Sequence, residues 1–181
     1  MKKKLIKKIL YLFLGVFLFL VVIFWIRDQF PKGEDFSQPV EIIGRDHIAY
    51  GVKFNNYNSN PPTSGPHYED PAPVKFYDQE LPDEQLVHNL EHGDIWISYK
   101  PDISPEIIEI LKDLAGRKVV VTKRSKNDTD IALAAWGRLD KFNLENNNFN
   151  KDNLNQIKQR IKDFILRYEN KGPEKENLMI R

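Results

Sequence analysis

The side chains of this sequence with the clearest chemical potential are its four histidines and one glutamate that lies among them. His88 and His92 are four residues apart in a segment with a helical pattern, so their imidazole rings share one face of the predicted helix. Glu91 follows His88 by three residues and lies on the same edge. Two imidazoles at this spacing can reach one ion, so the pattern indicates a two-point clamp for a transition metal.

The other two histidines lie upstream of this helix. His67 lies in a stretch rich in Asn, Pro, Ser and Gly (residues 55–73), whose prolines exclude a helix and a central strand and predict a long loop of defined shape. His47 begins a weakly alternating segment that favours a strand. The expected metal site comprises His67, His88 and His92, with His47 or Glu91 completing or supporting it.

The ligand types narrow the choice of ion. Imidazole with carboxylate suits zinc, copper(II), iron or nickel, whereas copper(I) sites usually contain Cys or Met. The chain has no cysteine, which excludes thiolate ligands, thiol catalysis and disulfides. The expected cofactor is therefore a copper or zinc ion, and the expected role is copper or zinc handling.

Two alternatives remain open at this level. His88–His92 also reads H-x-x-E-H, the inverted zincin pattern, in which two histidines hold zinc and the glutamate activates water. Under that alternative the chain is a metal-dependent hydrolase with Glu91 as the catalytic base. The other alternative is a structural or interaction module without metal, in which the histidines bond backbone carbonyls around the proline-rich loop.

The N-terminus predicts a membrane anchor. Residues 9–26 contain neither a charge nor a proline, and at about 1.5 Å per residue they span roughly 27 Å, close to the hydrocarbon thickness of a bilayer. Five lysines precede this run, while Arg27 and Asp28 nearly cancel after it, so the N-terminus is expected in the cytoplasm. The alternative is a cleaved signal peptide, which needs small residues at a cleavage site, and residues 24–30 contain none. We expect a single-pass protein of the cell membrane with its C-terminal domain outside the cytoplasm.

Charge limits the partners. Residues 31–181 carry 21 basic and 25 acidic side chains, and the basic ones are scattered. Nucleic acid and anionic lipid are therefore poor candidate partners, whereas the membrane, through the N-terminal helix, and a metal ion are expected ones. About 150 residues suffice for one hydrophobic core.

The patterning predicts an α+β fold, in which the anchor precedes one small mixed domain of about four strands and three helices. A strand, a helix and a second strand in succession indicate a parallel crossover, and the strand after them is expected to be antiparallel. The expected strands are 47–54, 94–99, 118–122 and 131–136, and the expected helices are 82–92, 104–116 and 154–168. The expected divisions are a basic tip with anchor (1–27), a stalk (28–46), a soluble extracytoplasmic domain (47–174) and a tail (175–181).

Two long motifs carry a family resemblance. Residues 57–67 read YNSNPPTSGPH, and residues 86–93 read LVHNLEHG, ahead of a strand that ends in YKP (residues 99–101). With Asp46-His47 near the start and Gly172-Pro173-Glu174 near the end, the chain resembles a bacterial family catalogued as domain of unknown function 3105, over roughly residues 45–174. The resemblance implies an N-terminal anchor and no established activity. It suggests that one motif set contains His47, His67, His88, Glu91 and His92.

Overall fold

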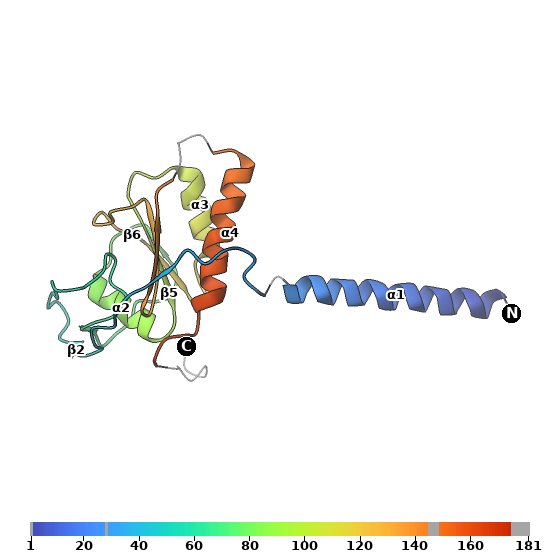
Figure 1. Cartoon of the computed structure of the whole chain (residues 1–181), viewed down its shortest axis with the longest axis horizontal. Coiled ribbons are helices and arrows are strands. Elements are labelled where there is room, and N and C mark those ends of the chain that lie inside the picture. Colours follow the sequence, from blue (N-terminus) through green and yellow to red (C-terminus); the bar gives the residue numbers. More distant parts are fainter. Residues whose placement is uncertain (1, 28, 145–148, 175–181) are drawn as a thin grey trace.

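A single long helix, α1 (Lys2–Arg27), extends away from the rest of the chain at its N-terminus (Figure 1). The structure is a computed structural model that describes residues 2–27, 29–144 and 149–174. By length and composition, the stretch Leu10–Arg27 of α1 is apolar enough to cross a membrane, and none of it is buried against the other described residues. One such helix is therefore present where the sequence predicts it.

The C-terminal part is built on a mixed sheet of six strands in the order β1-β8-β7-β5-β6-β4. Strands β5 and β6 are parallel, with Ile95 opposite Val119, and helix α3 connects them, so the predicted crossover is confirmed. The strands are β1 (Gln38–Pro39), β4 (Phe76–Tyr77), β5 (Ile95–Tyr99), β6 (Val119–Lys123), β7 (Ile131–Ala135) and β8 (Arg138–Phe142).

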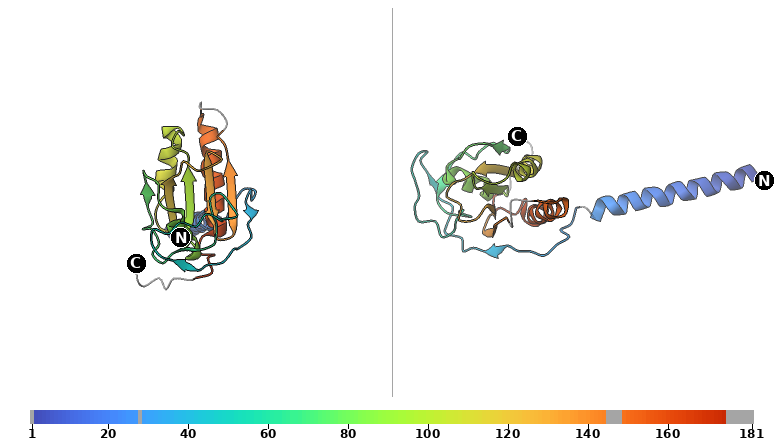
Figure 2. Two further views of the ribbon diagram at one scale, coloured as in Figure 1. Left: turned by 90° about the vertical axis from the view of Figure 1, so that its left-hand side faces the viewer. Right: turned by 90° about the horizontal axis from the view of Figure 1, so that it is seen from above.

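Three helices cover this sheet on its two faces. Helices α3 (Pro105–Leu114) and α4 (Lys151–Tyr168) lie side by side on one face, and α2 (Asp83–Glu91) lies against the other (Figures 1 and 2). In β5, Ile95 and Ile97 belong to the core beneath α3 and α4, while Trp96 belongs to the core on the α2 side. Because both faces are covered, β5 reads as a run of apolar residues rather than an alternation.

The α+β class and the three domain helices are confirmed, but the strand count is too low. The short strands β1 and β4 and the strand β8 extend the sheet beyond the expected elements, and β2 (His47–Ile48) and β3 (His67–Tyr68) form a separate parallel pair. The strand expected over 47–54 ends at Ile48 because a turn follows, in which the Val52 amide donates to the Ala49 carbonyl. The strand β7 is antiparallel as expected, and its partners are β5 and β8.

Part of the segment expected to be a stalk lies along the domain. The amides of Lys32 and Gly33 donate to the Asp163 carboxylate of α4 at 2.9 and 2.7 Å, and Gln38 pairs with Leu139 of β8. The path of the chain after α1 is therefore fixed against α4. The tail expected over 175–181 lies outside the described residues.

Candidate metal centre

Two histidines that are distant in sequence are paired by a short parallel ladder. In β2 and β3, His47 lies opposite His67, and Ile48 lies opposite Tyr68. The amide of His67 donates to the carbonyl of Asp46 at 3.0 Å. The pairing places two imidazole rings next to each other, with centroids 5.1 Å apart.

The proline-rich loop is held in shape by its polar groups. Gly65 has φ +116°, a left-handed conformation that glycine adopts without strain, and its amide donates to the Gly44 carbonyl. The Ser64 hydroxyl accepts from the Ile43 amide at 3.1 Å. The Tyr57 hydroxyl donates to the Pro66 carbonyl at 2.7 Å, and burial raises the pKa of Tyr57, so this donor stays protonated. These bonds fix the position of the histidine that follows.

Helix α2 supplies the remaining candidate ligands from a buried position. Leu86 and Leu90 face the core and are fully buried. Between them and the site, the Asn89 amide group accepts from the Ala72 amide at 2.9 Å and donates to the Ala72 carbonyl and to Asp94. Asn89 thereby anchors α2 to the chain that precedes it, and the next turn of the helix is presented to the histidines.

The C-terminal end of α2 is sealed by the chain after α4. The Asn170 amide donates to the Gly93 carbonyl, and the Glu174 amide donates to the Glu91 carbonyl at 3.1 Å. A Cβ atom at Gly172 would lie only 2.0 Å from the Glu91 carbonyl oxygen, so only glycine fits there. The Gly-Pro-Glu motif at residues 172–174 is thus part of the support for the site.

These elements bring four predicted site residues together. Ligand atoms of His47, His67, His88 and Glu91 all lie within 4.8 Å of one another, and together they can hold a metal ion. His67, His88 and Glu91 are buried, whereas the His47 side chain is 46% exposed. The cluster is therefore buried except at His47, which reaches the solvent.

Backbone carbonyls fix the tautomers of the two buried histidines. Nδ1 of His67 lies 2.7 Å from the Gly65 carbonyl, and Nδ1 of His88 lies 2.7 Å from the Tyr68 carbonyl. A carbonyl oxygen can only accept, so both Nδ1 atoms donate, and each neutral ring carries its lone pair on Nε2. Burial lowers the pKa of His88, against a smaller opposing effect of the Tyr68 carbonyl, and so favours this neutral form. Metal-binding histidines are commonly oriented by such a bond.

The free nitrogen of His67 faces a carboxylate. Nε2 of His67 lies 3.0 Å from Oε2 of Glu91, and the Glu91 side chain is only 3% exposed. With Nδ1 of His67 committed to a carbonyl, the neutral ring and the carboxylate present two acceptors to each other. This contact needs a cation between or beside the two atoms, which is either a proton on one of them or a metal ion. Arg45 and His47 approach Glu91 only to 4.0 Å.

His92 lies beside this group of four rather than within it. Its Nε2 is 2.7 Å from Nε2 of His88, a distance at which one nitrogen donates a proton to the other. Since Nδ1 of His88 donates to Tyr68, His92 is the donor when His88 is neutral. The predicted i, i+4 pair therefore exists, but its two members also contact each other directly.

Sequence reasoning did not assign two neighbours of the cluster to the site. Trp136, expected in the core, packs there and also places its ring 6.4 Å from that of His67. Arg45 points a guanidinium at Glu91 from the exposed side. Its position just before the Asp46-His47 motif is the one signal that pointed to it.

The comparisons give a family and no relative of known activity. Residues 52–179 match the family described as "Protein of unknown function (DUF3105)". Neither the curated proteins nor the solved structures include a match to this chain. Because the match extends over more than half of the chain, from the proline-rich loop through α2 to the C-terminal seal, the chain belongs to the DUF3105 family.

Proposed function

We propose that this chain is a membrane-anchored protein whose extracytoplasmic domain binds one transition-metal ion, copper or zinc. The proposed ligands are His67, His88 and Glu91, with His47 as the fourth. The observation that carries the proposal is the contact at 3.0 Å between Nε2 of His67 and the buried Glu91 carboxylate, on a ring whose other nitrogen is committed to a carbonyl.

Burial of these groups favours a metal over a purely structural cluster. An ionised carboxylate that is 3% exposed is costly to bury unless a cation balances it. The nearest fixed cation, Arg45, is 64% exposed and 4.0 Å away, so it offsets little of this cost. His67 and His88 each have both ring nitrogens within hydrogen-bond distance of a protein group, so a proton on Nε2 of His67 is the structural alternative to a metal ion at this contact.

The ligand set suits a four-coordinate ion. Three imidazole nitrogens and one carboxylate oxygen match the ligand types of zinc, and also of copper(II) in a tetragonal arrangement. Ligand atoms about 2.0–2.2 Å from one ion lie at most about 4.4 Å apart. The span of 4.8 Å is slightly wider, so one ligand moves inward on binding. His47 is the ligand free to do so, because it is exposed and lies on a two-residue strand.

The position of Glu91 bears on the hydrolase alternative. An inverted zincin needs His88 and His92 on the ion and the glutamate aside, next to a water. Here Glu91 lies among the candidate ligands, in contact with His67, and His92 contacts His88. This arrangement favours Glu91 as a ligand over Glu91 as a base. For His88 to bind the ion, His92 has to release Nε2 of His88, because Nδ1 of His88 is bonded to the Tyr68 carbonyl.

The proposed anchor is supported by α1. Its apolar stretch is long enough to cross a bilayer and is not buried against any residue that the structure describes, and the lysines before it favour a cytoplasmic N-terminus. The cluster would then lie on the extracytoplasmic side of the membrane.

The test measures metal bound by the full chain in detergent. The protein is stripped with a chelator, exposed to limiting copper, zinc, iron and nickel, and assayed by elemental analysis. Glu91→Gln is compared with Glu84→Gln, which changes a second buried carboxylate of the same helix that bonds the Phe54 amide instead. We expect one ion per chain, retained in Glu84→Gln and weakened in Glu91→Gln.

Each other outcome has a defined meaning. Full binding in Glu91→Gln with loss of a hydrolytic activity would make Glu91 a base. Absence of stoichiometric metal in the unmodified chain would leave the histidines as structural groups and overturn the proposal.

A further inference from the structure

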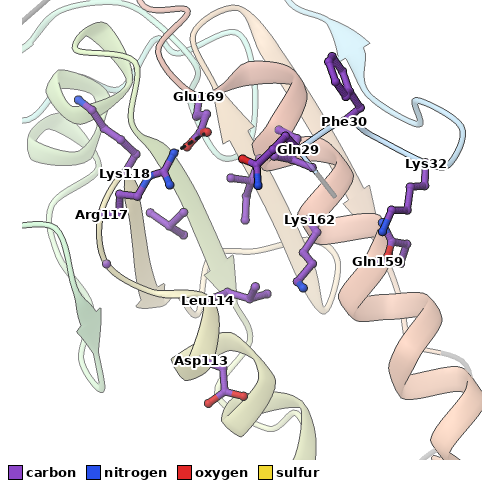
Figure 3. Close-up of a pocket in the computed structure, with 14 residues that line it drawn as sticks. Gln29, Phe30, Lys32, Asp113, Leu114, Arg117, Lys118, Gln159, Lys162 and Glu169 are labelled. Atoms are coloured by element: carbon purple, nitrogen blue, oxygen red, sulfur yellow. Dashed lines mark hydrogen bonds and ion pairs between the residues drawn. The ribbon is translucent and has the colours of Figure 1, made fainter. Parts of the chain in front are cut away.

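A cavity lies on the face of the sheet that α3 and α4 cover, away from the histidines. It has a volume of about 290 Å³ and is lined by the end of α3, the turn before β6, the middle and end of α4, and the residues that follow α1 (Figure 3). This volume is at the lower limit for ligand pockets, so it suits a small group rather than a large organic ligand. The metal site does not involve any of its lining residues.

The lining of this cavity is basic in a domain that carries more acidic than basic residues overall. Four cations line it against two acids, namely Lys32, Arg117, Lys118 and Lys162 against Asp113 and Glu169. Arg117 pairs with Glu169 at 3.2 Å, and Lys118 pairs with Asp94 at 3.0 Å. Lys162 forms no ion pair with any residue that the structure describes. The balance of charge favours an anionic ligand.

Arg117 lies in a tight turn at one wall of the cavity. Arg117 has φ +53°, in the left-handed region where glycine and asparagine are favoured. It follows Gly116 in a tight turn closed by two hydrogen bonds between Gly116 and Val119. A glycine at position 117 would form this turn more easily, and the Arg117 side chain reaches from the turn to Glu169 at 3.2 Å. Figure 3 shows Arg117 and Lys162 on opposite walls of the cavity.

The short chain segment after α1 limits how far the cavity can lie from the end of the apolar helix. Gln29, Phe30 and Lys32 line it, and they follow the apolar stretch that ends at Arg27. Three residues reach at most about 10 Å, so Phe30 stays within about 10 Å of the end of that stretch. The Lys32 and Gly33 amides are bonded to Asp163 of α4, which fixes this face of the domain near the anchor. With α1 in a bilayer, the cavity lies at the layer of lipid headgroups.

We propose that this cavity binds the phosphate of an anionic phospholipid headgroup in the leaflet next to the domain, through Arg117 and Lys162. The inference goes beyond metal binding and uses only the membrane anchor of the proposed function. Bound lipid would hold the domain in one orientation on the membrane, with the face that carries α3 and α4 toward the headgroups.

The test uses the full chain in detergent and native mass spectrometry. Retention of phosphatidylglycerol is compared with that of phosphatidylcholine with the same acyl chains. The test variant is Arg117→Asn/Lys162→Gln, in which asparagine suits the left-handed backbone, so the fold is expected to be preserved. The control Lys75→Gln/Lys126→Gln removes the same charge from exposed residues outside the cavity. Unchanged circular dichroism spectra and unchanged thermal unfolding check that both variants are folded.

We expect selective retention of phosphatidylglycerol that falls roughly tenfold or more in the test variant and hardly changes in the control, since a cation near an anionic lipid contributes about 1 kcal/mol. Equal retention of both lipids, or equal losses in both variants, overturns the proposal. Saturable binding of inorganic phosphate at the cavity without lipid selectivity assigns it to a free anion and overturns the lipid as occupant. Release of the chain from membranes by alkaline carbonate overturns the anchor and this proposal together, whereas lost lipid selectivity with the chain retained overturns this proposal alone.

Discussion

Oε2 of Glu91 lies 3.0 Å from Nε2 of His67, and both side chains are almost completely buried. The two residues come from the C-terminal turn of α2 and from the end of a proline-rich loop, 24 positions apart in the chain. Neither atom has a proton to donate when the imidazole is neutral and the carboxylate is ionised. The predictions below test what this contact implies for metal binding and what holds it in place.

The two histidines paired across β2 and β3 should contribute unequally to metal affinity. His67 is buried and oriented by the Gly65 carbonyl, whereas His47 is 46% exposed and has to move inward. His67→Ala should weaken binding by more than the roughly 10–100-fold typical of removing a residue that only orients a ligand, and His47→Ala should stay within that range. Competition with a chromophoric chelator measures both affinities. Equal losses would show that His47 is as fixed a ligand as His67.

Bound metal should stabilise the domain against heat. An ion that binds only the folded chain adds about 2.7 kcal/mol at a free concentration of 100 times its Kd. For a domain of this size, that corresponds to a rise in Tm of roughly 5–10 °C. Differential scanning calorimetry of the stripped and loaded chain measures the shift, and a chelator should reverse it. A Tm that does not depend on metal concentration would argue against binding to the folded state.

Removal of the Asn89 side chain should destabilise the fold. Asn89 is fully buried and satisfies both polar groups of Ala72 as well as Asp94. Asn89→Ala leaves these buried groups without their partner and should lower the free energy of unfolding by about 2–3 kcal/mol. Urea denaturation followed by circular dichroism measures this loss. Asn55→Ala, at an exposed position, is the control and should change stability by less than about 0.5 kcal/mol.

Substitution of Gly172 should damage the site from a distance in sequence. A Cβ atom there would lie 2.0 Å from the Glu91 carbonyl oxygen, so Gly172→Ala must push the C-terminal seal away from α2. We expect lower thermal stability and weaker metal binding, because Glu91 and its neighbours lose the contacts of Asn170 and Glu174. Lys171→Ala, at an exposed neighbouring position, should change neither quantity. Normal metal affinity in Gly172→Ala would show that the seal does not support the site.

The sequence predicted best what depends on local pattern. The helix that carries His88, Glu91 and His92 was predictable because its apolar residues repeat at helical spacing and acids begin it. The parallel crossover between β5 and β6 was predictable because a strand, a helix and a second strand follow one another in the sequence. Asn89 lies within the LVHNLEHG motif, but its role in anchoring α2 depends on Ala72, which is 17 residues away.

The elements that the sequence missed owe their structure to distant partners. Strands β2 and β3 contain two residues each, which is too short to show an alternation of apolar and polar residues. They form because the chain brings His47 opposite His67. In β8 the buried residue Asp140 breaks the apolar pattern, and only Arg160 of α4, at 2.6–2.9 Å, makes its burial tolerable. The sequence could not decide whether Glu91 is a base or a ligand, because that depends on where the loop places His67 relative to the Glu91 carboxylate.

Under the proposed topology, the seal formed by residues 170–174 sets an order of events during export. Helix α2 would cross the membrane well before residues 170–174, yet the end of the helix is closed only when these residues dock on Glu91 and Gly93. The complete site would then form only after residue 174 has crossed. A metal ion would therefore be acquired from the compartment outside the membrane. In the cytoplasm, ions would meet the histidines only while the segment that carries them is unfolded.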